Sequence, residues 1–407
     1  MSGLLGGIKA LKDTLHTWGK RMVPLFYGRN RSAEPYTATI LDELERQGYG
    51  CAREANPSAV QRRVSRFSDP SDSGSQRNSP TPRSKVSDPE SSIHSSPPEE
   101  SYVPPEPMAP EKAAALITSS FREVDTTPVR HIGSGTMFDA FRTSDDWVFR
   151  FPRWDWCGDL FEAEARIHQF VAKVLPARIR LPRVQLLAEP TERFPYAFAG
   201  HRFVPGIGAD AVDEALMPTV AREIAEFLGV LHSTPGAVAE AAGFREITID
   251  EAGRREWYEH GLAVSAQLRG LDPVIDDAID WLRAAPVPSP AFGPRQLIHS
   301  DLAPEHLLVD PATGTLLGVI DWTDGSIGDA ARDFVSLVTW RGWRFAEEVL
   351  ALYPRRVDGE FRSRLRYMAQ WLSVLWLAFA PEQGRDLEKD IAGVHNAFAP
   401  NAFQPSV

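Results

Sequence analysis

The chain has 407 residues, of which 43% are hydrophobic, so it is long enough to bury a sizeable core, and no apolar run reaches the about 18 residues of a transmembrane helix. Its two cysteines, Cys51 and Cys157, are too few for a disulfide framework, and they lead us to expect a reducing, cytoplasmic environment. After residue 120 the chain carries 29 basic against 41 acidic residues, an excess that argues against nucleic acid as a partner and permits a cationic small molecule.

The N-terminal part of the chain lacks the pattern of a folded domain. Residues 1–30 place Leu4, Ile8 and Leu11 at helical spacing beside several lysines, which predicts a short basic amphipathic helix. Such a helix could bind weakly to a membrane surface, dock on a partner or pack on the rest of the chain. Residues 31–115 are rich in serine, proline and charged residues, so they cannot bury enough apolar surface to offset the lost backbone entropy. We expect them to be mostly disordered.

Short strands and one helix are predicted between about residues 121 and 204. Val129–Phe141 reads as two strands joined by the turn Gly133-Ser134-Gly135, and Trp147–Pro152 reads as the next strand. A glycine-containing turn between antiparallel strands can close over nucleotide phosphates through its backbone N–H groups, although the same pattern fits a plain hairpin turn. Leu160–Val171 has the periodicity of an amphipathic helix.

Two apolar runs in the second half of the chain are each joined to acidic residues. The first run is preceded by the polar residues His299, Asp301 and His306, and the second ends at Asp321. Hydrophobic strands that bring Asp301 and Asp321 to one point supply what phosphoryl transfer from a nucleotide requires. One carboxylate orients a hydroxyl and accepts its proton, and the other holds the magnesium that bridges the phosphates. The two runs are Leu307–Val309 and Leu316–Ile320.

These residues resemble the aminoglycoside and macrolide phosphotransferases, antibiotic kinases that share the protein-kinase fold. The catalytic loop of that family reads His-x-Asp-x-x-x-x-Asn/His, which this chain matches at residues 299–306. The family's metal segment, Ile-Asp-Trp followed by Gly-Asp-Pro-x-x-Asp, is matched at residues 320–322 and 328–333, with alanine in place of the proline. The similarity runs from about residue 125 to about residue 395.

The resemblance implies an α+β, two-lobed protein-kinase-like fold. A small antiparallel-sheet N-lobe would span residues 121–204, and a larger helical C-lobe with the catalytic loop would span residues 205–400, after a largely disordered N-terminal tail. Asp301 would be the catalytic residue, while Asp321 and His306 would hold the metal. Because imidazole is a poorer magnesium ligand than the usual asparagine, direct ligation by His306, contact through water and a hydrogen bond to Asp301 all stay open. Three further residues would brace the loop: His299, Asp329 and Asp333.

The resemblance also implies the nucleotide contacts. The family places a lysine on the strand where this chain has Arg150, and it pairs that cation with a helix carboxylate, for which we prefer Glu164 over Glu162. Arg153 is a competing phosphate ligand. The remaining contacts are the turn that covers the phosphates, Gly133, Ser134 and Gly135, and the hinge backbone that contacts the base, Arg202 to Val204.

Together these features predict magnesium-dependent transfer of the γ-phosphate of ATP or GTP to a hydroxyl of a small molecule, and we expect an aminoglycoside- or macrolide-like antibiotic as acceptor. One alternative is a metabolic small-molecule kinase of the same fold. Another is a catalytically weak pseudokinase that acts as a binding protein, an alternative that Arg150 and His306 keep open. A protein kinase is disfavoured because Ile320-Asp321-Trp322 replaces Asp-Phe-Gly.

Overall fold

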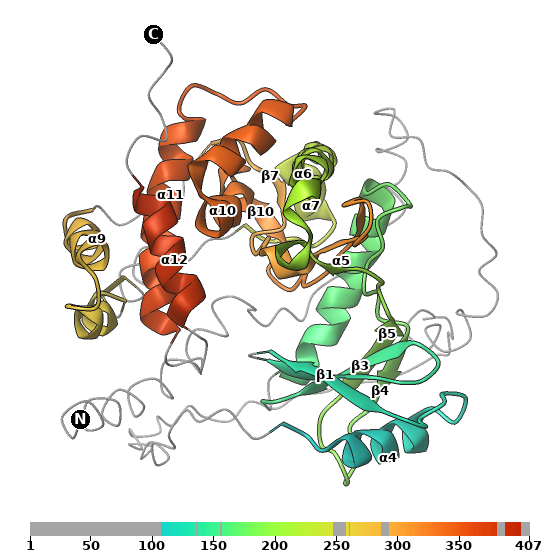
Figure 1. Ribbon diagram of the computed structural model, residues 1–407. Coiled ribbons are helices and arrows are strands. Elements are labelled where there is room, and N and C mark those ends of the chain that lie inside the picture. The colour runs from blue at the N-terminus through green and yellow to red at the C-terminus, as the bar shows by residue number, and fades with distance from the viewer. Residues whose placement is uncertain are drawn as a thin grey trace, which may run out of the picture.

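The computed structural model describes residues 107–135, 137–154, 157–246, 258–259, 261–285, 293–380 and 387–399, and these residues form two lobes (Figure 1). The predicted amphipathic segment and almost all of the predicted disordered tail lie outside the described residues. Within the described ranges, no helix combines the length and the apolar character needed to cross a membrane.

The N-lobe is built on a five-stranded antiparallel sheet with the strand order β1-β2-β3-β5-β4. Side chains alternate between the two faces of a strand, and this alternation places Phe149 and Phe151 on one face and Arg150 on the other. The strands are β1 (Arg130–Ser134), β2 (Phe138–Arg142), β3 (Trp147–Pro152), β4 (Leu186–Ala188) and β5 (Phe198–Arg202).

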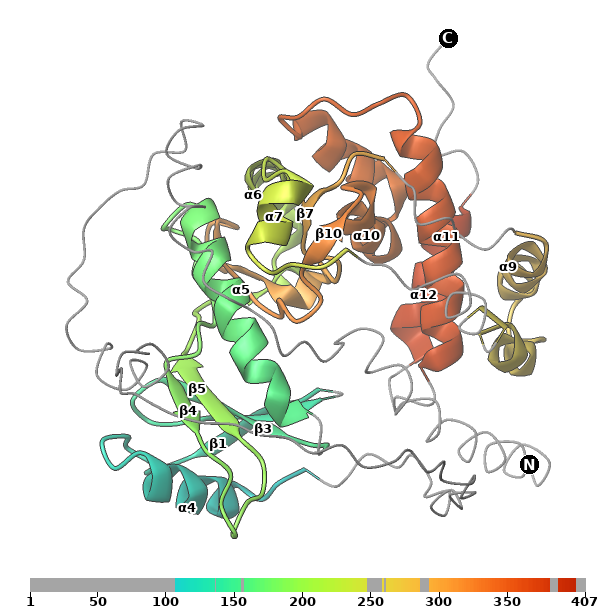
Figure 2. The same cartoon turned by 180° about the vertical axis from the view of Figure 1, so that it is seen from behind.

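Two helices cover the opposite faces of this sheet, α4 (Pro110–Ser120) on one side and α5 (Leu160–Val174) on the other (Figures 1 and 2). Leu116 and Ile117 of α4 pack against Phe149 in one buried cluster. Helix α4 precedes residue 121, the predicted start of the N-lobe, and packs on its sheet. Glycine is required at position 200 of β5, because a Cβ atom there would come within 2.6 Å of the Phe149 ring.

The C-lobe begins after a short linker at Pro205-Gly206. Gly206 has a φ of +127°, and a Cβ atom there would lie 3.0 Å from the carbonyl oxygen of Val309, so this crossing between the lobes needs glycine. One small sheet has the order β6-β8-β9, and a two-stranded sheet joins β7 to β10. The strands are β6 (Ile207–Gly208), β7 (Gln296–Ile298), β8 (Leu307–Val309), β9 (Leu316–Val319) and β10 (Ser326–Gly328).

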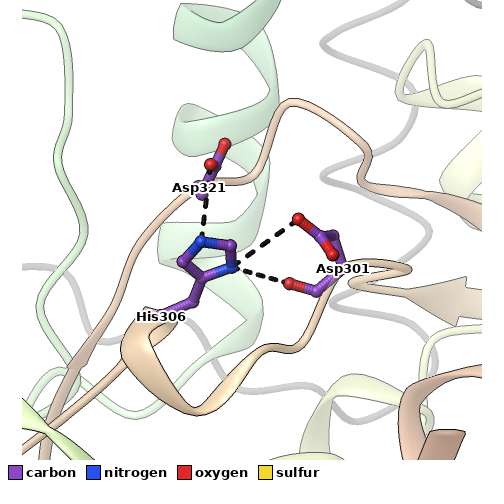
Figure 3. A group of neighbouring side chains, drawn as sticks. All are labelled: Asp301, His306 and Asp321. Carbon is purple, nitrogen blue, oxygen red and sulfur yellow. Dashed lines mark hydrogen bonds and ion pairs between the residues drawn. The ribbon is translucent and has the colours of Figure 1, made fainter. Parts of the chain in front are cut away.

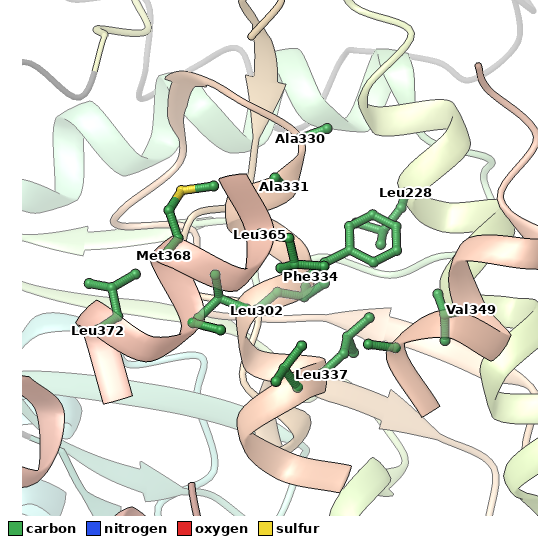
Figure 4. Close-up of a cluster of buried hydrophobic side chains, with 14 of the residues drawn as sticks. Leu228, Leu302, Ala330, Ala331, Phe334, Leu337, Val349, Leu365, Met368 and Leu372 are labelled. Atoms are coloured by element: carbon green, nitrogen blue, oxygen red, sulfur yellow. The ribbon is translucent and has the colours of Figure 1, made fainter. Parts of the chain in front are cut away.

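Helices supply most of the C-lobe and its core. The described helices are α6 (Met217–Leu231), α7 (Gly236–Ala241), α9 (Pro273–Ala284), α10 (Ala331–Leu352), α11 (Phe361–Phe379) and α12 (Leu387–Phe398). Leu302, which directly follows Asp301, is buried among side chains of these helices, including Phe334 and Leu365 (Figure 4). The core therefore anchors the polypeptide next to the predicted catalytic aspartate.

Candidate active site

An antiparallel hairpin brings the predicted catalytic and metal residues together. Strands β8 and β9 pair with Leu307 opposite Val319, and the ladder continues through the hydrogen bond from Ile320 N to the carbonyl oxygen of His306 at 3.0 Å. Residues that precede β8 and residues that follow β9 must then lie at the same end of the hairpin. This is why Asp301, His306 and Asp321 meet, although 20 residues separate the two aspartates (Figure 3).

The ring of His306 lies between the two carboxylates. Its Nδ1 is 3.8 Å from Oδ2 of Asp301, and its Nε2 is 3.6 Å from Oδ2 of Asp321. One ligand atom from each of the three side chains lies within 4.8 Å of the other two. Two carboxylates and an imidazole at this spacing fit a divalent cation.

The hydrogen bonding of His306 decides which nitrogen is available for a cation. Its Nδ1 is 2.8 Å from the carbonyl oxygen of Asp301, and because a carbonyl can only accept, Nδ1 carries the hydrogen. In the neutral ring, the lone pair is then on Nε2, which faces Asp321. Burial alone would lower the pKa of His306, but the charges of Asp321 and Asp301 outweigh it and raise the pKa. The two carboxylates therefore favour the protonated form of the ring.

The backbone is held in an uncommon conformation at two points of the site. Ser300 has a φ of +71° and Asp321 a φ of +60°, in the left-handed region that residues other than glycine rarely adopt. Such conformations persist only where surrounding contacts hold them, and they cluster at functional sites. Trp322 supplies two such contacts. Its Nε1 donates to the carbonyl oxygen of Val319 at 3.0 Å, and its ring packs on His299 at 4.6 Å between centroids.

Asp333 holds the backbone of the catalytic loop by hydrogen bonds. It is fully buried, and it accepts hydrogen bonds from the backbone N–H groups of His299 at 2.9 Å and Ser300 at 2.7 Å. Nε2 of His232 donates to the same carboxylate at 3.0 Å, so Nδ1 of His232 accepts from the Tyr353 hydroxyl at 2.8 Å. Burial opposes the ionisation of Asp333, but the hydrogen bond and charge of His232, together with His299, outweigh it and lower the pKa.

The other two predicted bracing residues also make local contacts. Nε2 of His299 lies 3.1 Å from the carbonyl oxygen of Ile320, which ties the catalytic loop to the metal segment. Asp329 accepts from the backbone N–H of Ala331 at the start of α10 and from Nε of Arg364 at 2.5 Å. Each of these residues holds the backbone near the acidic cluster without joining it.

On the N-lobe side, Arg150 forms a buried ion pair with Glu164. Its Nη2 donates to Oε2 of Glu164 at 2.5 Å. Glu162 is exposed, because it lies about 200° around the helix from Glu164. Arg153, the competing candidate, donates to the carbonyl oxygen of Gly135 at 2.8 Å and lies 3.7 Å from Asp139, so it braces the glycine turn.

The glycine turn is tied to its own hairpin. Gly133 and Ser134 end β1, and Gly135 donates to the carbonyl oxygen of Phe138 at 2.9 Å. The hydroxyl of Ser134 donates to Asp139 at 2.6 Å, so it already has a partner in the protein. Space around Gly133 is open, since a Cβ atom there would meet nothing within 4 Å.

The predicted hinge contacts, from Arg202 to Val204, are contacts of the backbone, and the side chains of these residues point elsewhere or are buried. Its guanidinium lies 3.9 Å from the centroid of the Trp147 ring and donates to the carbonyl oxygen of Asp145. Val204 is buried, and the N–H of the intervening Phe203 donates to the carbonyl oxygen of Asp146 at 2.8 Å. The side chain of Arg202 is thus turned to the β2–β3 turn and does not join the acidic cluster.

Two residues near the site had no role in the sequence interpretation, His168 and Arg332. His168 lies on α5 one turn after Glu164, with its Nε2 3.7 Å from Oε1 of Glu164. Burial, with the charge of Arg150 as the second cause, lowers the pKa of His168 to about 3. Its i, i+4 spacing from Glu164 was the signal that could have placed it on the buried face. No sequence signal places Arg332 beside Asp301.

Comparisons with known proteins identify the family of this chain. The model of the phosphotransferase enzyme family, abbreviated APH, matches residues 128–372. An uncharacterized protein of Bacillus subtilis (strain 168), YcbJ, is 31% identical over 143 residues, which cover 33% of this chain. The match covers 42% of that relative's own length, less than half of it.

Solved structures with a similar fold include two aminoglycoside phosphotransferase complexes. The GDP complex of wild-type aminoglycoside 2'-phosphotransferase-IIIa has a TM-score of 0.57 at 22% identity, over 71% of this chain and 97% of the other. The GDP and kanamycin complex of APH(2")-IIia has a TM-score of 0.55 at 22% identity, over 70% and 96%. These likenesses confirm the predicted two-lobed, protein-kinase-like α+β fold. Since the family model covers more than half of the chain, this protein belongs to the phosphotransferase enzyme family.

Proposed function

We propose that this protein transfers the γ-phosphoryl group of ATP or GTP to a hydroxyl of a small molecule. The observation that carries the proposal is the convergence of Asp301, His306 and Asp321 at one end of the β8–β9 hairpin. The buried pair of Arg150 and Glu164 on the other lobe supports it, because the pair holds a positive charge in place that could bind phosphate oxygens.

Asp301 would orient the acceptor hydroxyl and take its proton. The hydroxyl oxygen forms the new bond to the γ-phosphorus, the bond from that phosphorus to the β–γ bridging oxygen breaks, and the nucleoside diphosphate leaves. Because the transition state of such transfers is loose, positioning and charge contribute more than strong base catalysis. Arg150, fixed by Glu164, would hold phosphate oxygens with its planar fork of donors.

Asp321 and Nε2 of His306 would hold a magnesium ion. The fit rests on the hydrogen bond of Nδ1 to the Asp301 carbonyl, which leaves the Nε2 lone pair facing Asp321. Bound there, the ion would neutralise charge on the phosphates. Nitrogen is a less favourable magnesium ligand than oxygen, so His306 should make the choice of metal less strict than asparagine would.

For the acceptor, we propose antibiotic-like compounds of the aminoglycoside and macrolide classes as the first to test. A metabolic small molecule is the second candidate, and it is favoured by the charge that Arg332 places near Asp301. A cytoplasmic location, where nucleoside triphosphates are available, is part of the same proposal.

The test is nucleotide turnover by the full chain with ATP and with GTP, over a panel of aminoglycosides, macrolides, amino alcohols and sugars. Acceptor-dependent release of nucleoside diphosphate, with a phosphorylated product seen by mass spectrometry, is the expected result. Purified Asp301→Asn protein controls for contaminating kinases. Nucleotide binding without turnover on any acceptor would replace this proposal with the pseudokinase alternative.

A further inference from the structure

A cation without an ion-pair partner among the described residues stands next to Asp333, the residue that holds the catalytic loop at Ser300. Arg332 is the second residue of α10, and its Nη1 is buried with no hydrogen-bond partner. Its guanidinium lies over the ring of Trp376 on α11, 5.4 Å from the centroid. In the parts of the chain that the structure describes, no carboxylate oxygen comes within 4 Å of it.

The neighbouring residue connects Arg332 to the catalytic loop. Asp333 accepts from the backbone N–H of Ser300 at 2.7 Å, and Ser300 directly precedes Asp301. The charges of Asp301, Asp333 and Asp324 also act on Arg332. Burial lowers the pKa of Arg332, and these three charges offset the effect only in part.

No group of the described residues accepts a hydrogen bond from Nη1 of Arg332. The buried carboxylate next to it in sequence, Asp333, already accepts three hydrogen bonds, from His299, Ser300 and His232. Arg332 also stands in the first turn of a helix, where the helix dipole disfavours a positive charge. A buried donor without a partner and a cation at the wrong helix end both cost stability, and such violations of local rules gather at functional sites.

We propose that Arg332 forms, beside Asp301, a subsite that binds an anionic substituent of the acceptor, a carboxylate or a phosphate. This inference rests on the proposed function and, of its two acceptor candidates, favours the second, a metabolic hydroxyl compound, here one that also carries negative charge. The planar guanidinium donates two parallel hydrogen bonds, a geometry that carboxylate and phosphate oxygens match and that an ammonium group does not. Polycationic aminoglycosides would meet like charge at this position.

Binding of matched probes to the full chain saturated with MgADP tests the subsite. The probes are glycerol 3-phosphate and D-glycerate, with glycerol as their uncharged counterpart and ethanolamine as the cationic one. We expect the anionic probes to bind about 10- to 100-fold more tightly than glycerol, the range for one or two hydrogen bonds to a charged group. Arg332→Met should remove this preference, and Arg332→Lys should keep part of it. Arg366→Met is the matched control, because Arg366 is also partly buried on α11 and lies over the ring of Trp343.

The outcomes separate this inference from the proposed function. Equal binding of charged and uncharged probes, or an unchanged preference in Arg332→Met, overturns the subsite even if phosphate is transferred to neutral alcohols. Loss of affinity for a non-hydrolysable ATP analogue without loss for ADP assigns Arg332 to the donor's γ-phosphate and also overturns it. Anion binding that depends on Arg332 in a protein without turnover leaves the subsite standing and removes the proposed function. Melting temperatures of both Arg332 variants near that of the unmodified protein confirm that they are folded.

Discussion

Arg150 and Glu164 of the N-lobe form a buried ion pair, whereas Asp301 and Asp321 of the C-lobe lie at an accessible surface. The first two side chains are 14% and 2% exposed and 2.5 Å apart. The two aspartate side chains are 39% and 43% exposed, and the ion-pair distances from their carboxylates to the ring nitrogens of the intervening histidine are 3.8 and 3.6 Å. A buried pair holds its geometry but loses much when one partner is removed, while exposed carboxylates remain free to bind a ligand. Substitutions in the N-lobe pair should therefore cost stability and activity together, and those in the C-lobe cluster should cost activity alone.

The largest expected effect is on the C-lobe side. Asp301→Asn should leave the melting temperature and nucleotide affinity unchanged and lower turnover by about 10³- to 10⁴-fold, because the amide cannot accept the acceptor's proton. Nucleotide turnover and nucleotide titration of the same preparation provide the measurement. Turnover near that of the unmodified protein would remove Asp301 from the mechanism.

Arg150→Ala should lower turnover by about 10²- to 10³-fold, since it removes one or two charge-assisted contacts to phosphate. It should also destabilise the protein by about 3 kcal/mol, because Glu164 would remain buried without its partner. Arg150→Lys should retain most of the turnover, and adding Glu164→Ala to Arg150→Ala should cost little more.

The control for the Arg150 series is Arg142→Ala. Arg142 pairs with Asp146 at the surface, where such pairs contribute about 1 kcal/mol or less. If Arg142→Ala and Arg150→Ala lost equal stability by chemical denaturation, the contrast between buried and exposed pairs would be wrong.

His168, next to Glu164 on α5, should make stability depend on pH. Its pKa is about 3 in the fold, below the ordinary value of 6.5, so on acidification the unfolded chain takes up a proton that the folded chain does not. The free energy of unfolding is therefore highest above pH 6.5 and decreases as the pH falls from 6.5 towards 3. Between pH 7 and pH 5 the loss should reach about 2 kcal/mol, and denaturant titrations of His168→Leu should show a correspondingly smaller slope. An identical slope in both proteins would contradict this assignment.

His306→Asn tests the choice of metal with a smaller effect. An oxygen ligand suits magnesium better than imidazole, so the ratio of magnesium-supported to manganese-supported turnover should rise by about 10-fold, an effect worth about 1.4 kcal/mol. Metal titrations of turnover measure it. An unchanged ratio would indicate that His306 acts through water or by holding Asp301.

Removal of residues 1–106 should have the smallest effect. Its composition predicts few packed contacts, so melting temperature and turnover should stay nearly unchanged. The matched control removes residues 1–121, which include α4, and it should destabilise the protein strongly because Phe141, Phe149 and Phe151 would lose their cover. A large loss in the shorter truncation would show that the N-terminal segment docks on the lobes.

Much of the site followed from local sequence because local geometry builds it. Apolar runs flanked by polar residues predicted the β8–β9 hairpin, and the pairing of an antiparallel hairpin places Asp301 and Asp321 at the same end. Strand alternation likewise put Arg150 on the face that α5 covers. The choice of Glu164 over Glu162 came from the family's spacing, and helical periodicity explains it.

Other features depend on packing between distant segments and left no local signal. Helix α4 was not predicted as an element, since its short apolar face is stabilised by the sheet that it covers. The position of Arg332 beside Asp301 depends on how α10 packs against Leu302 and α11, which the sequence of α10 alone does not specify. Tertiary contacts decide both.

The left-handed backbone of Asp321 bears on how this protein would change if its activity were no longer selected. Glycine adopts that conformation without the steric cost of a Cβ atom, which is about 1 kcal/mol or more for other residues. Asp321→Gly should therefore melt at a higher temperature than the original chain while lacking a proposed metal ligand. If only stability were selected, a substitution at Asp321 would be among the first to be fixed in the site. We expect a relative with glycine at the equivalent position to be thermally more stable, to retain nucleotide binding and to lack catalytic activity.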